Sequence, residues 1–249
     1  MKAVILAAGK GTRMRDLTSE MPKPMLKVQG KPILEHILQG IVAAGIRDCF
    51  IVTGFRAEVI EKHFDGGSNW GAHICYGRQE VQDGTGKAPE PARSFIAGSP
   101  FLLTYGDILV KPETYKRMVD RFHEGDFSGV ITVTRGQDVT KGGLDFFDDQ
   151  FYLRRVVEKP SASQLEELRR GGWLKQGEPV WYNAGIYVFK PVVYEFISTL
   201  QKSPRGEYEL TDAISGMVQA GHKLAGLEIE GRWVDVRDPE VLEKLRTER

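Results

Sequence analysis

A strand-like apolar run that leads directly into a glycine-rich loop opens the sequence. Residues 2–7 read KAVILA, and the loop continues as Gly9-Lys10-Gly11-Thr12-Arg13. A loop of this kind, leaving the carboxyl end of a central parallel strand, arranges backbone N–H groups around a concave anion site. Arg13 and the nearby Lys23 add positive charge. The opening segment therefore predicts phosphate binding on an α/β sheet.

Two common phosphate-binding motifs do not fit this loop. No Gly-Lys-Ser/Thr ends it, so it is not a P-loop, and Met14 occupies the place of the third glycine of a dinucleotide fingerprint. Taken alone, Gly9 and Gly11 could also form only a tight turn. The surrounding residues must decide between these interpretations.

Apolar runs alternate with helical spacing through the first half of the chain, up to about residue 125. This alternation predicts a doubly wound, mostly parallel, Rossmann-like α/β sheet. The second half, about 126–249, has more strands and fewer helices between them, which predicts an added mixed sheet on the other side of a cleft. We expect both halves to form a single domain over residues 1–249. The expected strands of the first half cover residues 2–7, 49–53, 74–76 and 101–105, and its helices cover 32–44, 57–64 and 112–123. The expected strands of the second half cover residues 130–134, 144–147, 152–158, 185–189 and 233–236, and its helices cover 161–170, 192–200, 210–220 and 239–246.

Composition excludes several classes of partner. The 249 residues include 34 basic and 34 acidic ones, so the chain has no overall field to attract nucleic acid or an anionic membrane. No segment approaches the length of a membrane span and the N-terminus does not resemble a signal peptide, so we expect a cytoplasmic protein. Cys49 and Cys75 lie in apolar, strand-like surroundings, which favours buried thiols over a disulfide or a metal pair.

Two acids follow apolar runs at distant places in the sequence. Asp107 ends the run Phe101 to Gly106, and Asp235 ends Trp233-Val234-Asp235. Two carboxylates of this kind, completed by water and phosphate oxygens, suit the octahedral preference of Mg²⁺. Either acid alone could instead cap a helix, because each is expected to precede one.

Two further segments place polar groups beside strands. Gln79 stands shortly before Gly84-Thr85-Gly86, and a glutamine amide can match the edge of a uracil or thymine ring. Glu158-Lys159 and Asn183 lie in the second half, where carboxylate and amide groups suit sugar hydroxyls and a lysine suits a phosphate. A surface loop remains the alternative for the segment around Gln79.

Taken together, these motifs resemble those of the sugar-1-phosphate nucleotidylyltransferases, in the short form without a C-terminal acyltransferase domain. The resemblance rests on Leu6-Ala7-Ala8-Gly9-Lys10-Gly11-Thr12-Arg13-Met14 with Pro22-Lys23-Pro24, on the Gln79 and Gly84-Thr85-Gly86 segment, on Gly106-Asp107, on Glu158-Lys159-Pro160, on Asn183-Ala184-Gly185, and on Gly231-Arg232-Trp233-Val234-Asp235. It implies an enzyme that joins a nucleoside triphosphate to a sugar 1-phosphate and releases pyrophosphate, with Mg²⁺ as cofactor. Relatives often form dimers or tetramers, which leaves a homo-oligomer open.

The resemblance also implies residue roles. Arg13 would bind the departing pyrophosphate and Lys23 would neutralise the attacked α-phosphate, while Asp107 and Asp235 would hold the metal. The nucleotide-binding residues it implies are Leu6, Ala8, Gly9, Gly11, Thr12, Gln79, Gly84 and Thr85. The sugar-phosphate-binding residues it implies are Gly143, Glu158, Lys159 and Asn183. The segment Glu207-Tyr208-Glu209-Leu210-Thr211-Asp212 also resembles a family motif, but Thr211 and Asp212 are expected to begin a helix rather than to take part in the chemistry.

Several departures from the family pattern leave alternatives open. Asp16 stands where proline is more frequent, Pro89-Glu90-Pro91 interrupts the expected helix after the base loop, and Val236-Arg237 replaces Gly-Thr after Asp235. UTP is the expected nucleotide, with dTTP, CTP and GTP open. Rival interpretations are cytidylyl or guanylyl transfer to another phosphorylated acceptor, a metal-dependent glycosyltransferase, and a non-catalytic protein that binds nucleotide sugars.

Overall fold

The computed structural model describes residues 1–247, and within them the side chains of Arg15 and Asp16 are not described. Asp16, which stands where the family more often has proline, therefore lies outside the described side chains. None of the helices within residues 1–247 is long and apolar enough to cross a membrane.

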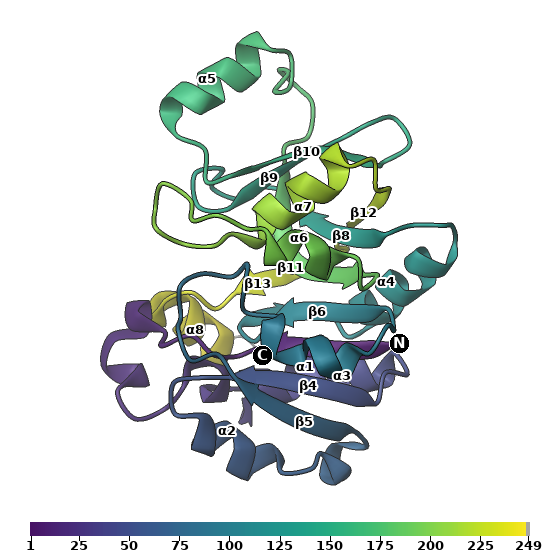
Figure 1. Cartoon of the computed structure of the whole chain (residues 1–249). Helices are drawn as coiled ribbons and strands as arrows, with labels where there is room; N and C mark the ends of the chain where they lie inside the picture. Colours follow the sequence, from purple (N-terminus) through teal and green to yellow (C-terminus); the bar gives the residue numbers. More distant parts are fainter. Residues whose placement is uncertain (248–249) are drawn as a thin grey trace.

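Four parallel strands form the nucleotide-side half of one large sheet (Figure 1). β1 (Lys2–Leu6) pairs with β4 (Asp48–Thr53) on one side and with β6 (Phe101–Tyr105) on the other, and β5 (His73–Arg78) continues beyond β4. Residues 3–6 are at most 8% exposed. Such burial on both faces explains why this strand reads as a continuous apolar run rather than as an alternating pattern.

Helices cover both faces of this sheet, as a doubly wound fold requires. On one face the core includes Ile33, Ile60, Met118 and Leu242, and on the other it includes Ile96, Ile197 and Met217. The helices of the first face are α1 (Ile33–Ala43), α2 (Ala57–Phe64), α4 (Glu113–His123) and α8 (Pro239–Thr247). Those of the second face are α3 (Arg93–Ile96), α6 (Val193–Ser198) and α7 (Leu210–Gln219).

The second half of the chain extends the same sheet with antiparallel strands. β11 (Trp181–Phe189) lies antiparallel to β6 and pairs also with β8 (Gly129–Thr134) and β9 (Gly143–Phe147). β10 (Leu153–Glu158) pairs with β9 and forms the sheet edge, while β12 (Leu224–Glu228) runs parallel to β8. The predicted α/β fold with a mostly parallel sheet and an added mixed part is confirmed. The finding beyond it is that β11 joins the two parts by hydrogen bonds, across the boundary expected near residue 125.

Small elements complete the chain. α5 (Ala162–Arg170) begins with a capping box between Ser161 and Gln164, and its Leu165 and Leu168 pack against β9. Two short ribbons are separate from the large sheet: β2 (Lys27–Val28) with β3 (Lys31–Pro32), and β7 (Ile108–Val110) with β13 (Trp233–Asp235). The 3-10 helices are η1 (Thr12–Thr18), η2 (Lys23–Met25), η3 (Ser68–Trp70) and η4 (Glu90–Ala92).

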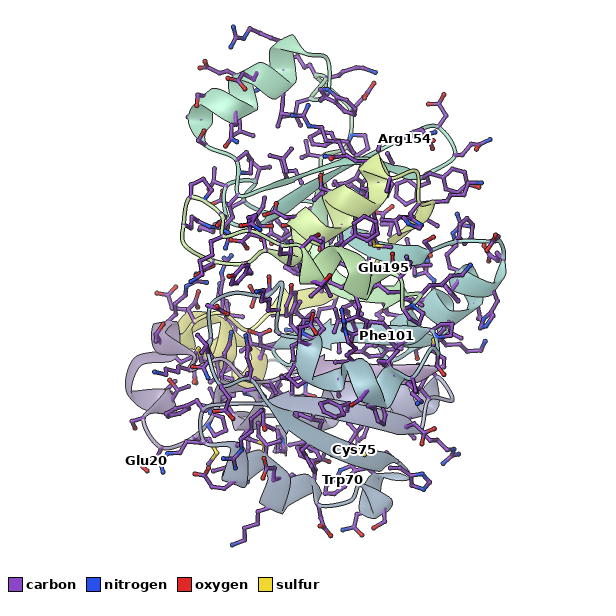
Figure 2. The ribbon with its side chains drawn as sticks, in the orientation of Figure 1. Glu20, Trp70, Cys75, Phe101, Arg154 and Glu195 are labelled. Carbon is purple, nitrogen blue, oxygen red and sulfur yellow. The ribbon has the colours of Figure 1, made fainter. Side chains whose placement is uncertain are left out.

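Two sequence-based expectations are wrong in detail. Asp107 precedes strand β7 rather than a helix, so it cannot act as a helix cap. Cys75 is exposed, whereas Cys49 is buried, and both thiols are free. Cys75 lies on β5, the edge strand opposite β10 in the sheet, where a residue facing away from buried Ile74 is left open to solvent (Figure 2).

Candidate active site

The glycine loop after β1 is held in shape by Gly11. Gly11 has a φ of +62°, and a Cβ there would lie 3.0 Å from Lys23 Cβ. Its carbonyl accepts hydrogen bonds from Met14 N at 2.8 Å and Thr18 Oγ1 at 3.0 Å, which starts the 3-10 turn. The positive φ and the close approach both favour glycine at this position. The loop thus brings its backbone next to Lys23.

Lys23 lies between two carboxylates that come from distant parts of the chain. Its Nζ donates to Asp107 Oδ2 at 2.6 Å and lies 3.9 Å from Asp235 Oδ1. The Lys23 side chain is 12% exposed, whereas those of Asp107 and Asp235 are 30% and 32% exposed. The ammonium is therefore largely withdrawn from water while the two acids still reach the cavity.

Strand pairing explains how the two acids meet. Asp107 directly follows β6 and precedes β7, and β13 pairs antiparallel with β7 so that Asp235 stands opposite Ile108. Val236 N donates to the Asp107 carbonyl at 3.0 Å, and Trp233 Nε1 donates to the Ala184 carbonyl of β11 at 2.9 Å. These hydrogen bonds attach residues 233–236 to Asp107 in the first half of the chain and to β11 in the second half.

The surroundings of Asp235 shift its pKa. Burial, followed by the negative charge of Asp107, raises the pKa of Asp235 to about 6 against the opposing effects of Lys23, Arg237 and Arg13. Two carboxylates beside one another in a partly buried site favour a bound cation that neutralises both. In this structure the Lys23 ammonium has that role.

One cavity of about 240 Å³ connects this cluster with the sugar-side motifs. Eight of the predicted site residues line it: Arg13, Thr85, Asp107, Gly143, Glu158, Lys159, Asn183 and Asp235. The resemblance-based residues that do not line it are Leu6, Ala8, Gly9, Gly11, Thr12, Lys23, Gln79 and Gly84. Of these, Lys23 lies behind the lining because it contacts Asp107 and Asp235, and Gly11 lies beside Lys23.

Glu158 and Lys159 form the charged wall of the cavity at the end of β10. Glu158 Oε2 accepts from Thr211 Oγ1 at 3.1 Å, and Glu158 Oε1 lies 3.6 Å from both Lys159 Nζ and Arg205 Nη2. Lys159 has a φ of +41°, and its N–H donates to the Gly142 carbonyl at 3.1 Å. A positive φ is unfavourable for lysine, and the hydrogen bond to Gly142 holds Lys159 in this conformation. The same bond therefore sets the direction in which the Lys159 side chain projects from the end of β10.

Asn183 is the most restrained of the predicted sugar-side residues. Its Oδ1 accepts from Gly185 N at 3.1 Å and from the Tyr187 hydroxyl at 2.6 Å, and its Nδ2 donates to Asp145 Oδ2 at 2.9 Å. A register shift in β11 between Asn183 and Tyr187 accompanies this arrangement. The amide is thereby held in one orientation at the cavity wall.

The predicted base loop packs against the start of α7. Gly84 has a φ of +125°, and a Cβ there would lie 2.3 Å from the Tyr208 carbonyl oxygen, so only glycine fits. Thr85 Oγ1 accepts from Leu210 N at 3.2 Å. Gln79 Nε2 donates to the Gly84 carbonyl at 3.3 Å, so half of its amide supports the loop and its oxygen remains for a ligand.

The structure also brings to the cavity several residues to which the sequence analysis assigned no role in the site. They are Tyr105, Ile108, Lys141, Gly142, Tyr182, Gly185, Tyr187, Glu207, Glu209, Thr211 and Trp233. Thr211 lies in the first turn of α7, as expected, and also lines the cavity. Its segment, Glu207 to Asp212, was already recognised as similar to a family motif, and this likeness was the signal that could have placed Thr211 and Glu209 in the site.

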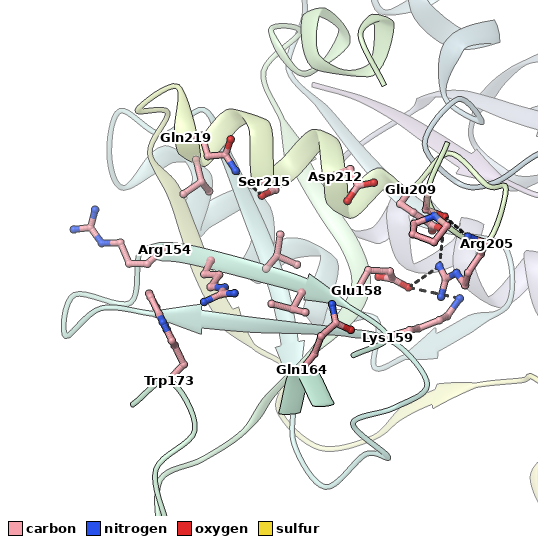
Figure 3. A pocket seen from close by; sticks show the side chains of 16 residues that line it. Arg154, Glu158, Lys159, Gln164, Trp173, Arg205, Glu209, Asp212, Ser215 and Gln219 are labelled. Carbon is pink, nitrogen blue, oxygen red and sulfur yellow. Dashed lines mark hydrogen bonds and ion pairs between the residues drawn. The ribbon is translucent and has the colours of Figure 1, made fainter. Parts of the chain in front are cut away.

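A larger groove of about 760 Å³ adjoins the cavity along the free edge of β10 (Figure 3). Glu158, Lys159 and Glu209 line both spaces. Arg205 crosses the groove mouth, contacting Glu209 as well as Glu158. The end of the cavity at Glu158 and Lys159 is therefore open towards α7 and Trp173 rather than closed.

By themselves, the acidic side chains of the site provide only some of the ligands that a divalent ion needs. Within residues 1–247 no group of three or more His, Cys, Asp and Glu side chains gathers to hold a metal. Asp107 and Asp235 place two carboxylates around one cation, Lys23 Nζ. Such a pair suits Mg²⁺, which usually retains waters and takes further oxygens from substrate phosphates.

Known proteins resemble this chain in sequence and in structure. The sequence model of the nucleotidyl transferase family matches residues 2–247. The chain belongs to this family. It is 30% identical to a UTP–glucose-1-phosphate uridylyltransferase of Haloferax volcanii, over 96% of this chain and 93% of that protein.

Longer relatives match over part of their length. A low-salt glycan biosynthesis nucleotidyltransferase of Haloferax volcanii is 32% identical, and a bifunctional protein GlmU of Methanococcus aeolicus is 33% identical, each over 96% of this chain. The chain spans 63% of the first relative and 52% of the second. These relatives carry additional sequence that this chain does not match.

Solved structures support the fold. A protein assigned as a glucose-1-phosphate thymidylyltransferase from Bacillus anthracis superposes with a TM-score of 0.84 at 23% identity, covering 99% of this chain and 94% of that one. A UDP-glucose pyrophosphorylase bound to UDP-glucose gives the same TM-score at 20% identity, covering 98% and 96%. At such identities the likeness establishes the architecture alone.

Proposed function

We propose that this chain transfers a nucleotidyl group from a nucleoside triphosphate, with UTP favoured, to a sugar 1-phosphate. The observation that carries the proposal is the meeting of Asp107 and Asp235 at Lys23, in a cavity that also contains Glu158, Lys159 and Asn183. This arrangement combines a cation-dependent polyphosphate site with groups suited to sugar hydroxyls. Family membership supports the nucleotidyl transfer, and the names of the relatives support the sugar phosphate.

The reaction is a direct displacement. An oxygen of the acceptor's phosphate forms a bond to the α-phosphorus of the triphosphate, while the bond from that phosphorus to the bridging oxygen breaks. Pyrophosphate leaves with the electron pair on that oxygen. No protein nucleophile takes part, so catalysis consists of positioning and charge neutralisation.

Each cation of the site has a separate task in this scheme. Arg13 neutralises the pyrophosphate as it leaves, Lys23 the α-phosphate under attack, and Lys159 the phosphate of the acceptor. Glu158 and Asn183 orient the sugar through its hydroxyls, and Thr211 holds the Glu158 carboxylate through its 3.1 Å hydrogen bond.

The proposed cofactor is Mg²⁺, held by Asp107 and Asp235. When bound, it would neutralise phosphate oxygens and hold the nucleotide in place. The Lys23 ammonium, which now lies between the two acids, would then be free to turn towards the α-phosphate. This exchange explains why a lysine and two acids occupy one small site.

The base loop supports uracil or thymine over other bases but does not separate the two. Uracil and thymine present the same hydrogen-bonding edge to the free amide oxygen of Gln79 and differ only by a methyl group. The uridylyltransferase relative, matched over 93% of its length, favours UTP.

A substrate matrix tests the proposal. Four nucleoside triphosphates are combined with a panel of sugar 1-phosphates and Mg²⁺, and both pyrophosphate and the nucleotide sugar are measured. We expect one or two combinations to exceed the others by at least tenfold, with UTP among them. A protein that binds nucleotide sugars but forms none in any combination would show that the site is a binding site only.

A further inference from the structure

Asp145 is a buried acid that the scheme above does not use. It lies in β9 between Leu144 and Phe146 and is 1% exposed. One of its oxygens, Oδ2, accepts from Asn183 Nδ2 at 2.9 Å, and the other, Oδ1, has no hydrogen-bond partner among the residues that the structure describes. An apolar side chain would fill this position at lower cost, because a buried polar atom without a partner is destabilising. The acid therefore requires an explanation other than packing.

Its contact with Asn183 supplies one. The backbone N–H of Gly185 can only donate, so the Asn183 atom that it contacts at 3.1 Å must be the amide oxygen. The amide nitrogen consequently faces Asp145, and Tyr187 donates its hydroxyl hydrogen to the oxygen at 2.6 Å. Three groups thus fix the amide, and the nitrogen keeps one hydrogen that Asp145 does not take.

We propose that Asp145 is a positioning residue for the acceptor: it holds the Asn183 amide so that the second N–H is presented to a sugar hydroxyl in the cavity. Asp145 itself does not touch the substrate. The inference rests on the proposed function, because it assigns the sugar end of the cavity to the acceptor. It extends that function by placing a determinant of acceptor binding outside the cavity lining.

The charge state of Asp145 agrees with this role. Burial, together with a smaller effect of the nearby charge of Glu158, raises the pKa of Asp145 to about 8 against the opposing hydrogen bond from Asn183. The titratable groups that face it are Glu158 on β10 and Tyr187 on β11, whose own pKa is raised well above its usual value by burial. Near neutral pH a protonated Asp145 can accept from Asn183 without placing a second negative charge beside the acceptor's phosphate site.

Two substitutions separate positioning from packing. Asp145→Asn keeps an oxygen that can accept from Asn183, whereas Asp145→Leu fills a similar volume and removes the acceptor. Asp149→Asn is the matched control, because Asp149 is exposed in the turn after β9. The KM for the sugar 1-phosphate is measured at saturating nucleotide, and the KM for the nucleotide at saturating sugar phosphate.

The expected result is specific to the acceptor. For Asp145→Leu we expect the acceptor KM to rise about tenfold, the size of one lost hydrogen bond, while the nucleotide KM changes less than twofold. Asp145→Asn should stay within threefold of wild type at pH 7. Between pH 7 and 9 the wild-type acceptor KM should rise as Asp145 ionises, whereas that of Asp145→Asn should lack this step.

The opposite results would overturn the proposal. An acceptor KM for Asp145→Leu within twofold of wild type, or an equal rise in both KM values, would reduce Asp145 to a structural role. If Asp145→Leu does not fold, Tyr187→Phe removes the other side-chain anchor of the amide and should give the same acceptor-specific rise; no rise would count against the proposal. Failure of the proposed function is seen separately, as wild-type protein without product from any sugar phosphate.

Discussion

The acids around Lys23 and the acid beneath Asn183 are both withdrawn from solvent, yet they are compensated in different ways. Asp107 and Asp235 are about one-third exposed and share a cation, Lys23 Nζ, at 2.6 and 3.9 Å. Asp145 is 1% exposed and, among the described residues, has no basic side chain in contact; it meets the neutral Asn183 amide instead. The first pair of acids is balanced by a positive charge, which suits polyphosphate chemistry, whereas burial raises the pKa of Asp145 to about 8 and so favours its neutral form near pH 7, which suits the fixing of a hydrogen bond.

The largest test of this contrast removes the shared cation. Lys23→Ala leaves Asp107 and Asp235 without their partner and deprives the α-phosphate of a positive charge, so we expect kcat/KM to fall by about 100-fold or more. Steady-state rates of pyrophosphate release measure the loss. Lys27→Ala, at an exposed lysine of β2, is the control and should behave as wild type. A rate for Lys23→Ala within threefold of wild type would refute the role assigned to Lys23.

Removing one of the two acids beside Lys23 should weaken the binding of Mg²⁺. Asp235→Asn leaves a single carboxylate for Mg²⁺, and we expect the Mg²⁺ concentration for half-maximal rate to rise at least tenfold. A magnesium titration at fixed substrate concentrations measures it. Asp126→Asn, whose side chain is 94% exposed beside Lys190, is the matched control. An unchanged magnesium requirement would show that Asp235 is not a ligand.

A smaller effect follows from the loop that holds Lys23. Gly11→Ala places a methyl group 3.0 Å from Lys23 Cβ at a φ of +62°, so we expect a loss of about 1–2 kcal/mol in the free energy of unfolding together with a roughly tenfold lower rate. Urea denaturation and pyrophosphate release measure the two effects. Gly66→Ala, where a Cβ meets no atom within 4 Å, should change neither. Equal behaviour of the two variants would mean that the loop adapts without cost.

The smallest expected effect concerns the contribution of Asp145 to the stability of the fold. The pKa of Asp145 is about 8 in the fold and near 4 in an unfolded chain, so between these values the folded protein binds a proton that the unfolded chain lacks. Stability from this group therefore falls as pH rises from about 4 to about 8. Asp145→Asn removes this loss, and its Tm relative to wild type should be higher at pH 8 than at pH 5.5, by roughly 2–4 °C for each kcal/mol regained.

Thermal unfolding at the two pH values provides the measurement, with Asp149→Asn at an exposed acid as the control. A Tm difference between Asp145→Asn and wild type that is independent of pH would show that Asp145 is ionised in the folded protein.

The parallel half of the fold was predictable because its strands are buried on both faces. The bounds of β6 and α2 agree with the expected ranges, since each is set by local apolar spacing and local breakers. β7 and β12 were missed. β7 has only three residues and forms by pairing with β13, and β12 carries Gly226 at its centre, which interrupts the apolar pattern. Pairing between distant segments leaves little local signal.

The residues of the candidate site likewise divide into those that local sequence motifs indicated and those that depend on contacts between distant segments. Asp107, Glu158 and Asn183 end or begin apolar runs within recognisable motifs, so the sequence placed them. Gln79 donates to the Gly84 carbonyl and does not line the cavity around Asp107, and its assigned role towards the base stays a prediction. Arg205 and Asp145 gave no signal, because the first depends on how a loop folds back to Glu158 and the second reads as one polar residue in an apolar strand.

β11 has a consequence for how such a protein can change shape. This nine-residue strand pairs with β9 at its start, with β8 on both sides of a register shift, and with β6 over residues 186–189, and it carries Asn183 near its start. Because β6, β8 and β9 all hydrogen-bond to this one strand, the two halves of the chain belong to one sheet. The separation of Asp107, which follows β6, from Asn183 is therefore set by strand pairing, and a change in it would have to break ladder hydrogen bonds.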